Sequence, residues 1–253
     1  MLKKINNKDK FRYFDFTIDN YRKAIEYINF YSKIYTYDDA LEIQKGVILR
    51  HDVDISLENA VSLAEIECKL KIKTTYCLLL HSQFYNLLDR TNIENVKKII
   101  KYGHNIGLHF DVHALNIRDV DMLQEWLLKE KRILESYFDI AINIFSFHNN
   151  NTFTFSCREW KYSGMINAYS DVFWNGFNYL SDSNGIWKDE SLLDFVKRNI
   201  NQKMHILLHP VWWSKEVISP KERVEIVAKR KTDTCLSEYY RLLRFFNKNV
   251  IDG

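Results

Sequence analysis

Five short apolar runs along this sequence each end in a histidine, and amphipathic patterns separate the runs. The run at 47–51 follows Gly46 and is rich in β-branched residues, which predicts a buried strand. Ser56 can cap a helix after it. The same alternation predicts further strands at 74–80, 105–110, 142–147, 167–173 and 204–208, and helices at 92–102, 123–137, 192–199 and 234–246. Because strands alternate with helices, we expect a mainly parallel sheet covered by helices.

The five histidines help to choose between an open doubly wound sheet and a barrel. In a parallel barrel the carboxyl ends of all strands converge on one face, whereas an open sheet spreads them along a line. A single histidine at a strand end is most simply explained as tolerated there, but five together favour an α/β barrel, incomplete or distorted. The five are His51, His81, His109, His148 and His209.

Composition indicates one domain over 1–253, since the chain is 46% hydrophobic and can bury one large core. The net charge of +3 is spread along the chain, so nucleic acid is not an expected partner. Residues 1–10 lack the apolar segment of a signal peptide, and no run is long enough for a membrane span. Together with four scattered cysteines, this predicts a cytoplasmic protein. The oligomeric state stays open.

Two aspartates follow the first predicted strand. Asp52 and Asp54 are two residues apart, so on an extended strand they face the same side, about 6–7 Å apart along the chain. Two carboxylates would then share one site. An acidic pair at the N-terminus of the next helix explains the same residues equally well.

Two histidines four residues apart form the second motif. If a helical turn begins near His109, His109 and His113 lie on one face and can bind one metal ion. His205 and His209 have the same spacing, but they lie on a predicted strand, where four residues span roughly 13 Å. His109 and His113 are therefore the better pair. An aspartate from the first strand would complete a two-histidine, one-carboxylate site.

A third group surrounds His209. Pro210 prevents a helix from following directly, so the imidazole is presented at the rim of the fold, where it suits a proton donor. Asp182 can hold such a histidine protonated. Trp187 and Trp212 can offer apolar faces to a sugar ring, although a tryptophan is more often packing.

These motifs resemble the polysaccharide deacetylases, a carbohydrate esterase family that includes chitooligosaccharide and peptidoglycan deacetylases. The resemblance runs from about 47 to 213 and implies a distorted, incomplete (β/α) barrel. By similarity to the family's first motif, Asp52 is the base and Asp54 a metal ligand. By similarity to the second motif, His109 and His113 are the other two ligands.

The fourth and fifth motifs resemble the segments around Asp182, Trp187 and His209, and the resemblance implies that His209 is the general acid. The sequence departs from the family's motifs in two places. Val53 separates aspartates that are adjacent in the family, and the third motif lacks its usual arginine, which steadies the base. Arg50 is expected on the opposite strand face and so does not replace it.

In place of that arginine, His148 and Asn149 are expected to line the substrate pocket. The expected activity is hydrolytic removal of an acyl group, most simply N-acetyl, from an amino sugar. The expected cofactor is a divalent metal, zinc by default, with iron, cobalt or nickel also compatible.

The expected substrate is a sugar, a sugar nucleotide or another glycan precursor made inside the cell. A monosaccharide unit needs one or two aromatic platforms, such as Trp187 and Trp212. A catalytically silent carbohydrate-binding protein and a barrel metallohydrolase acting on a non-sugar amide are the alternatives.

Overall fold

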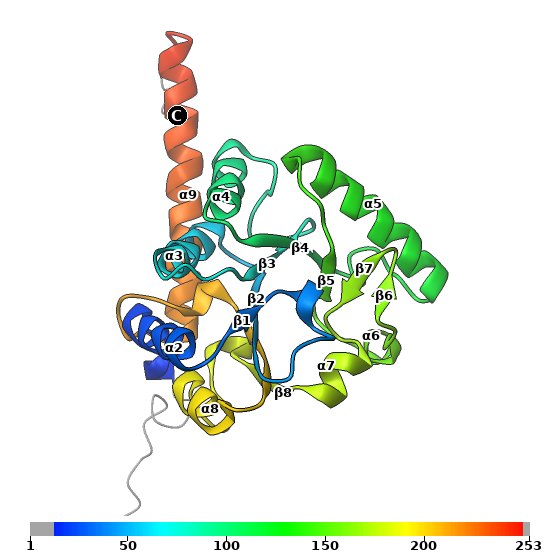
Figure 1. The fold of residues 1–253 in the computed structure, drawn as a ribbon. Helices are drawn as coiled ribbons and strands as arrows, with labels where there is room; N and C mark the ends of the chain where they lie inside the picture. Colours follow the sequence, from blue (N-terminus) through cyan, green and yellow to red (C-terminus); the bar gives the residue numbers. More distant parts are fainter. Residues whose placement is uncertain (1–12, 250–253) are drawn as a thin grey trace, which may run out of the picture.

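One curled sheet organises the molecule, as the computed structural model of residues 13–249 shows (Figure 1). Within these residues nine strands pair in the order β6-β7-β5-β4-β3-β2-β9-β8, and β1 pairs with β2. Neighbouring strands are parallel except for β6 and β7. Strands β6 and β8 lie at opposite ends of this order, so the barrel is open between them. The expected incomplete (β/α) barrel is confirmed.

The strands are short, and helices separate most of them. The strands are β1 (Ile34–Tyr35), β2 (Gly46–Val53), β3 (Thr75–Leu79), β4 (Asn105–Phe110), β5 (Ile144–Phe147), β6 (Lys161–Tyr162), β7 (Met165–Asn167), β8 (Asn178–Ser181) and β9 (Lys203–Leu208). The α-helices are α2 (Ile18–Tyr31), α3 (Leu57–Lys69), α4 (Arg90–Lys101), α5 (Val120–Phe138), α6 (Thr152–Ser156), α7 (Asp171–Gly176), α8 (Leu192–Asn199) and α9 (Pro220–Phe245). The 3₁₀ helices are η1 (Tyr13–Asp15), η2 (Tyr37–Asp39), η3 (Ser183–Gly185) and η4 (Pro210–Trp212).

Two sequence expectations need correction. The strand expected at 167–173 ends at Asn167, and its second half belongs to helix α7. Helix α9 begins at Pro220 rather than near 234. Its start is marked by a capping box, in which the Ser219 hydroxyl accepts from the backbone N–H of Glu222 and the Glu222 carboxylate accepts from that of Ser219.

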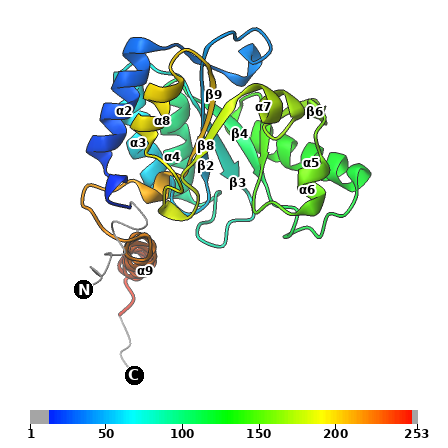
Figure 2. The same ribbon diagram turned by 90° about the horizontal axis from the view of Figure 1, so that it is seen from below.

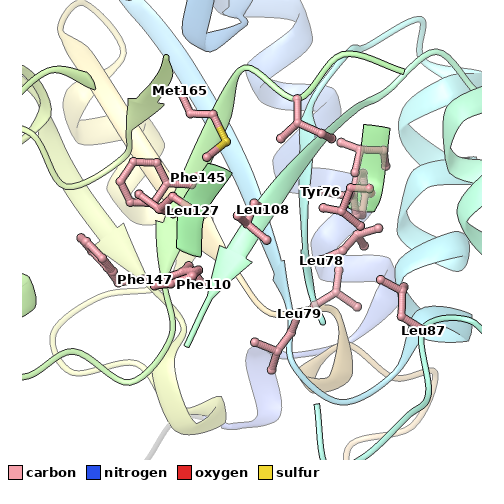
Figure 3. Close-up of a cluster of buried hydrophobic side chains, with 14 of the residues drawn as sticks. Tyr76, Leu78, Leu79, Leu87, Leu108, Phe110, Leu127, Phe145, Phe147 and Met165 are labelled. Atoms are coloured by element: carbon pink, nitrogen blue, oxygen red, sulfur yellow. The ribbon is translucent and has the colours of Figure 1, made fainter. Parts of the chain in front are cut away.

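Helices cover the outer face of the sheet (Figure 2), and the two larger apolar clusters lie between the sheet and these helices. Every residue of β2 is buried, which places this strand at the centre of the molecule. The largest apolar cluster packs β3, β4 and β5 against the neighbouring helices, with Tyr76, Leu108 and Phe145 among its members (Figure 3). This packing fixes the strands whose ends carry the polar residues.

Helix α9 differs from the other helices because its C-terminal half extends away from the sheet (Figure 1). At its base, Arg223 donates to the backbone oxygens of Tyr13 and Phe16. Among the described helices, α9 included, none combines the length and the hydropathy that crossing a membrane requires.

Candidate metal centre and active site

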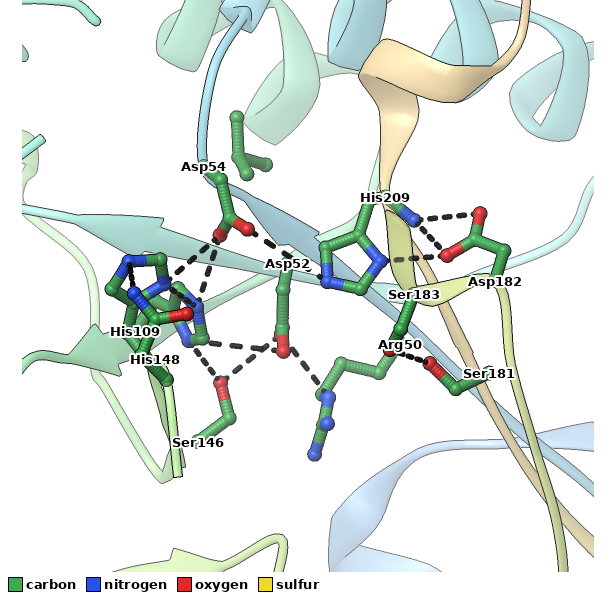
Figure 4. Close-up of polar contacts among 12 residues, drawn as sticks. Arg50, Asp52, Asp54, His109, Ser146, His148, Ser181, Asp182, Ser183 and His209 are labelled. Carbon is green, nitrogen blue, oxygen red and sulfur yellow. Dashed lines mark hydrogen bonds and ion pairs between the residues drawn. The ribbon is translucent and has the colours of Figure 1, made fainter. Parts of the chain in front are cut away.

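A cavity of 580 Å³ opens at the carboxyl ends of the central strands. Strand β2 contributes Arg50 and Asp52 to its lining, and Asp54 follows directly after the strand. The curl of the sheet brings further polar side chains, from β4 and from just past the ends of β5 and β9, to the same place (Figure 4). These are His109, His148, Asn149 and His209. Both aspartates therefore line one cavity.

Three candidate metal-ligand atoms lie close together near the carboxyl end of β2. His109 Nε2 lies 3.0 Å from Asp54 Oδ1, and His148 Nδ1 lies 3.5 Å from the same oxygen. The two histidine nitrogens are 3.1 Å apart. Atoms that bind one ion at about 2.0–2.2 Å in tetrahedral geometry lie about 3–4 Å from one another. Asp54, His109 and His148 could therefore hold a metal ion.

The surroundings of Asp54 fit a cation. Its Oδ1 atom is buried and, within residues 13–249, makes no hydrogen bond of acceptable geometry, although both imidazoles approach it closely. Burial raises the pKa of this carboxyl, but the close approach of the His109 and His148 imidazoles and the charges of His109 and His209 lower it well below its ordinary value. A deprotonated, buried oxygen that faces two imidazole nitrogens is a suitable metal ligand.

His113, expected as the third ligand, is not part of this cluster. Strand β4 continues through Phe110, so His109 is extended rather than at the start of a helical turn. His113 lies in the following turn, where its Nε2 is 2.8 Å from the backbone oxygen of Asn149. His148 takes its place because β5 is the parallel neighbour of β4, with Ser146 beside His109.

Asp52 is held by two buried side chains. Arg50 Nε lies 3.1 Å from Asp52 Oδ1, and the Ser146 hydroxyl donates to the same oxygen at 3.0 Å. The expectation that Arg50 faces the opposite side of the strand is wrong, because residues two apart on a strand share a face. The Ser146 hydroxyl also lies 2.8 Å from His109 Nδ1, so it connects the Asp52 carboxylate to one of the three candidate metal ligands.

On the other side of the cavity, His209 is anchored by Asp182. His209 Nδ1 is 2.6 Å from Asp182 Oδ1, and the His209 backbone N–H donates to both carboxylate oxygens. The indole N–H of Trp213 donates to Asp182 Oδ2 at 3.1 Å. Burial lowers the pKa of His209, but the charge and hydrogen bond of Asp182 raise it, to about 9. The imidazole is therefore protonated at neutral pH. Its other nitrogen, Nε2, lies 3.8 Å from Asp54 Oδ2.

The two tryptophans expected to contact sugar have different positions. Trp212 lines the cavity, but Trp187 does not. Trp187 is 2% exposed and stacks on Phe16 with ring centroids 4.6 Å apart. Its environment is that of a core residue.

Two of the five strand-end histidines also lie away from the cavity. His51 is inside β2 and points to the opposite face, where its Nε2 is 2.8 Å from Glu67. His81 lies 2.9 Å from Glu130. Of the five histidines expected to meet on one face, three line the cavity: His109, His148 and His209.

Sequence reasoning missed several residues of the site. The period of two along β2 could have placed Arg50 beside Asp52. Ser146 could not be found that way, since its role depends on β4 and β5 being neighbours. The exposed aromatics Phe155 and Trp174, which line the cavity, belong to short helices that the sequence did not predict.

Among the comparisons with known proteins, only the search of solved structures found similar proteins. No family model matches the chain, and no curated protein matches it. Peptidoglycan deacetylase PdaC from Bacillus subtilis is 16% identical over 79% of this chain and 96% of that one, with a TM-score of 0.44. The chitin deacetylase of the fungal pathogen Colletotrichum lindemuthianum is 14% identical over 75% and 85%, with a TM-score of 0.43.

BA3943, a CE4 family pseudoenzyme from Bacillus anthracis, is 17% identical over 74% of this chain, with a TM-score of 0.43. The chain spans 62% of that protein's length, which is less than two thirds. The site residues described above are therefore placed by the geometry of this chain alone.

Proposed function

We propose that this chain is a metal-dependent hydrolase that removes an acyl group, N-acetyl in the simplest case, from an amino sugar. The observation that carries the proposal is that two different proton-transfer groups lie beside the ligand cluster. Asp54, His109 and His148 form the cluster; the Asp52 carboxylate lies 3.7 Å from His109, and the protonated His209 lies 3.8 Å from Asp54. Amide hydrolysis at a Lewis-acid site requires both a base and an acid.

A divalent ion, zinc by default, would polarise the acyl carbonyl and lower the pKa of a water molecule at this site. Asp52 would accept the proton of the attacking water. Arg50 and Ser146 keep its carboxylate oriented, because both contact Oδ1, while Oδ2 lies 3.7 Å from His109 Nδ1.

His209 would give its proton to the leaving nitrogen. Asp182 fixes the imidazole through Nδ1, which leaves Nε2 free to face the substrate. Once the amine leaves, the same aspartate favours reprotonation of the ring. An amine is a poor leaving group without such a proton, so the acid is as necessary as the base.

A catalytically silent sugar-binding protein was the first alternative, suggested by the missing third-motif arginine. The ion pair of Arg50 with Asp52 supplies a guanidinium to the base from another strand position and favours an active enzyme. A non-sugar amide substrate is the second alternative. Exposed aromatic rings and the Asn149 amide around the cavity favour a ring that carries hydroxyl groups.

The test is acetate release from N-acetylated amino sugars by protein loaded with zinc, cobalt or nickel. We expect release that a chelator abolishes and added metal restores. Simple acetylated amides of similar size serve as the control. Preferential cleavage of those amides would replace the sugar substrate, and no release with any metal would contradict the hydrolase itself.

A further inference from the structure

Helix α9 projects from the body of the molecule and leaves large apolar side chains exposed. Its base is fixed, because Arg223 donates from Nε to the Ser214 hydroxyl at 3.1 Å as well as to two backbone oxygens. Beyond this base the helix extends away from the sheet (Figure 1). Six large apolar side chains near its end are 41–72% exposed: Leu236, Tyr239, Tyr240, Leu242, Phe245 and Phe246. Burial would stabilise them, so this end of the helix suits a partner.

Most of these side chains share one face of α9. Residues three, four and seven apart lie on the same side of an α-helix. Leu236, Tyr239, Leu243 and Phe246 follow one another at intervals of three and four residues, and Leu242 lies beside them at the same spacing from Tyr239 and Phe246. Such a stripe normally faces the core of a globular protein, whereas here it lies on the part of the helix that leaves the sheet.

The opposite face of α9 is basic. Arg230, Arg241 and Lys248 lie there, about half a turn from the apolar stripe. The helix has seven lysines and arginines against four acidic residues, which gives it a net charge of +3. This equals the net charge of the whole chain, so the positive excess is concentrated on α9 rather than spread along the chain as expected. One apolar face and one basic face are typical of helices that lie in the surface of an anionic membrane.

We propose that the distal half of α9, residues 232–248, binds the surface of a bilayer that contains anionic lipids. The leucine and phenylalanine side chains enter the boundary between head groups and acyl chains, where the apolar face of such a helix is buried by about 5–10 Å. Tyr239 and Tyr240 suit the same depth, because each combines an apolar ring with a polar hydroxyl. The lysine and arginine side chains stay at the level of the lipid phosphates, which attract them.

A second copy of this chain is a poorer partner for the same face. Two α9 helices side by side would each bring a net charge of +3 and would repel one another. The stripe also places Tyr239 and Phe246 where a two-stranded coiled coil prefers aliphatic side chains. A nucleic acid would match the charge, but its phosphate backbone offers no apolar interior for the leucines.

The experiment measures how the whole chain partitions onto lipid vesicles. Vesicles of phosphatidylcholine alone are compared with vesicles in which phosphatidylglycerol replaces a third of the lipid, and bound protein is measured by co-sedimentation. We expect binding to the anionic vesicles to be about tenfold stronger. This preference should fall as the NaCl concentration rises, because salt screens the attraction.

Two variants test the two faces of the helix separately. Phe246→Ser should weaken binding to the anionic vesicles about tenfold, since one buried phenyl ring is lost. Phe30→Ser, which alters an 80% exposed phenylalanine on α2, is its control and should bind like the wild type. Arg244→Gln should weaken binding about fivefold at low salt, whereas Arg132→Gln, at an exposed position on α5, should not weaken it.

Equal binding to both kinds of vesicle, or binding that survives both α9 variants, would overturn the proposal. So would a stable dimer that Phe246→Ser dissociates, measured by light scattering, if the wild type binds no vesicles. Retention of a single-stranded oligonucleotide in place of vesicles would also overturn it. Acetate release from a soluble acetylated sugar should be the same for the wild type and Phe246→Ser, so the membrane result stands or falls independently of the proposed hydrolase.

Discussion

Strand β2 carries ionisable side chains on both faces, and the two faces differ in how these side chains are satisfied. On the inner face, Arg50 and Asp52 border the cavity, and Asp54 presents a buried oxygen without a hydrogen bond among the described residues. On the outer face, His51 pairs with Glu67, and both are 0% exposed. His51 is the sequence neighbour of both Arg50 and Asp52, so adjacent residues of one strand belong to the two different arrangements.

The outer cluster saturates its carboxylate. Glu67 accepts from the hydroxyls of Tyr21 and Tyr76 at 2.6 Å each and from Thr74 at 2.9 Å, in addition to the contact with His51. A buried charge with a partner on every side holds elements together. A buried charge with an atom left open toward a cavity is a candidate for chemistry. The comparison predicts that inner-face changes reduce activity and outer-face changes reduce stability.

The largest effect should come from Asp52→Asn. The amide fills the same space but cannot accept a proton, so kcat should fall by about 10²–10⁴ while the protein still binds metal. Steady-state acetate release and metal content measure the two properties. If Asp52→Asn loses the metal and Asp54→Asn keeps it, the two aspartates have exchanged roles.

Glu67→Ala is the matching change on the outer face. It leaves His51 and two tyrosine hydroxyls without their buried partner, so the free energy of unfolding should fall by about 3–5 kcal/mol. Urea denaturation measures this loss. The metal affinity of the folded variant should match that of the wild type. Loss of metal binding with unchanged stability would contradict the assignment of a structural role to the outer face.

The same residue gives the outer face a pH dependence. Burial raises the pKa of Glu67, but the charge and hydrogen bond of His51 lower it, to about 2. Because the folded value lies below the ordinary 4.5, this contribution to stability is complete above about pH 4.5 and is lost as the pH falls toward 2. Unfolding free energies across this window should fall more steeply for the wild type than for Glu67→Gln, and parallel curves would count against the pairing.

A smaller effect is expected for Arg50→Lys. Lysine keeps the charge but cannot reproduce the contact between Arg50 Nε and Asp52, so kcat should fall by about 10–100-fold with KM and metal content little changed. Arg22→Lys, in an exposed pair with Asp19, is the control and should leave the rate unchanged. A pure KM effect would assign Arg50 to substrate binding instead of to positioning the base.

Sequence reasoning succeeded where one segment determines the geometry. Period-two alternation put Asp52 and Asp54 on one side, and the same rule, applied consistently, also places Arg50 there. It failed where the geometry depends on which strands are neighbours. The approach of His148 to His109 follows from the pairing of β4 with β5, and no spacing along the chain encodes that pairing.

Helical spacing also misled in one place. His109 and His113 fit a helical turn, but β4 extends past His109 because the segment through Phe110 pairs with β5. The pairing of a central strand overrides a local pattern of two histidines. Trp187 shows the same limit, since its burial against Phe16 depends on a segment more than 150 residues away in sequence.

The most direct test of the account compares the metal affinity of His148→Ala with that of His113→Ala. Calorimetric titration with zinc, combined with elemental analysis of the purified variants, measures it without requiring activity. We expect His148→Ala to lose more affinity than the roughly 10–100-fold that removal of a residue behind the ligands costs, whereas His113→Ala should bind zinc like the wild type. Loss of zinc by His113→Ala with retention by His148→Ala would contradict the account.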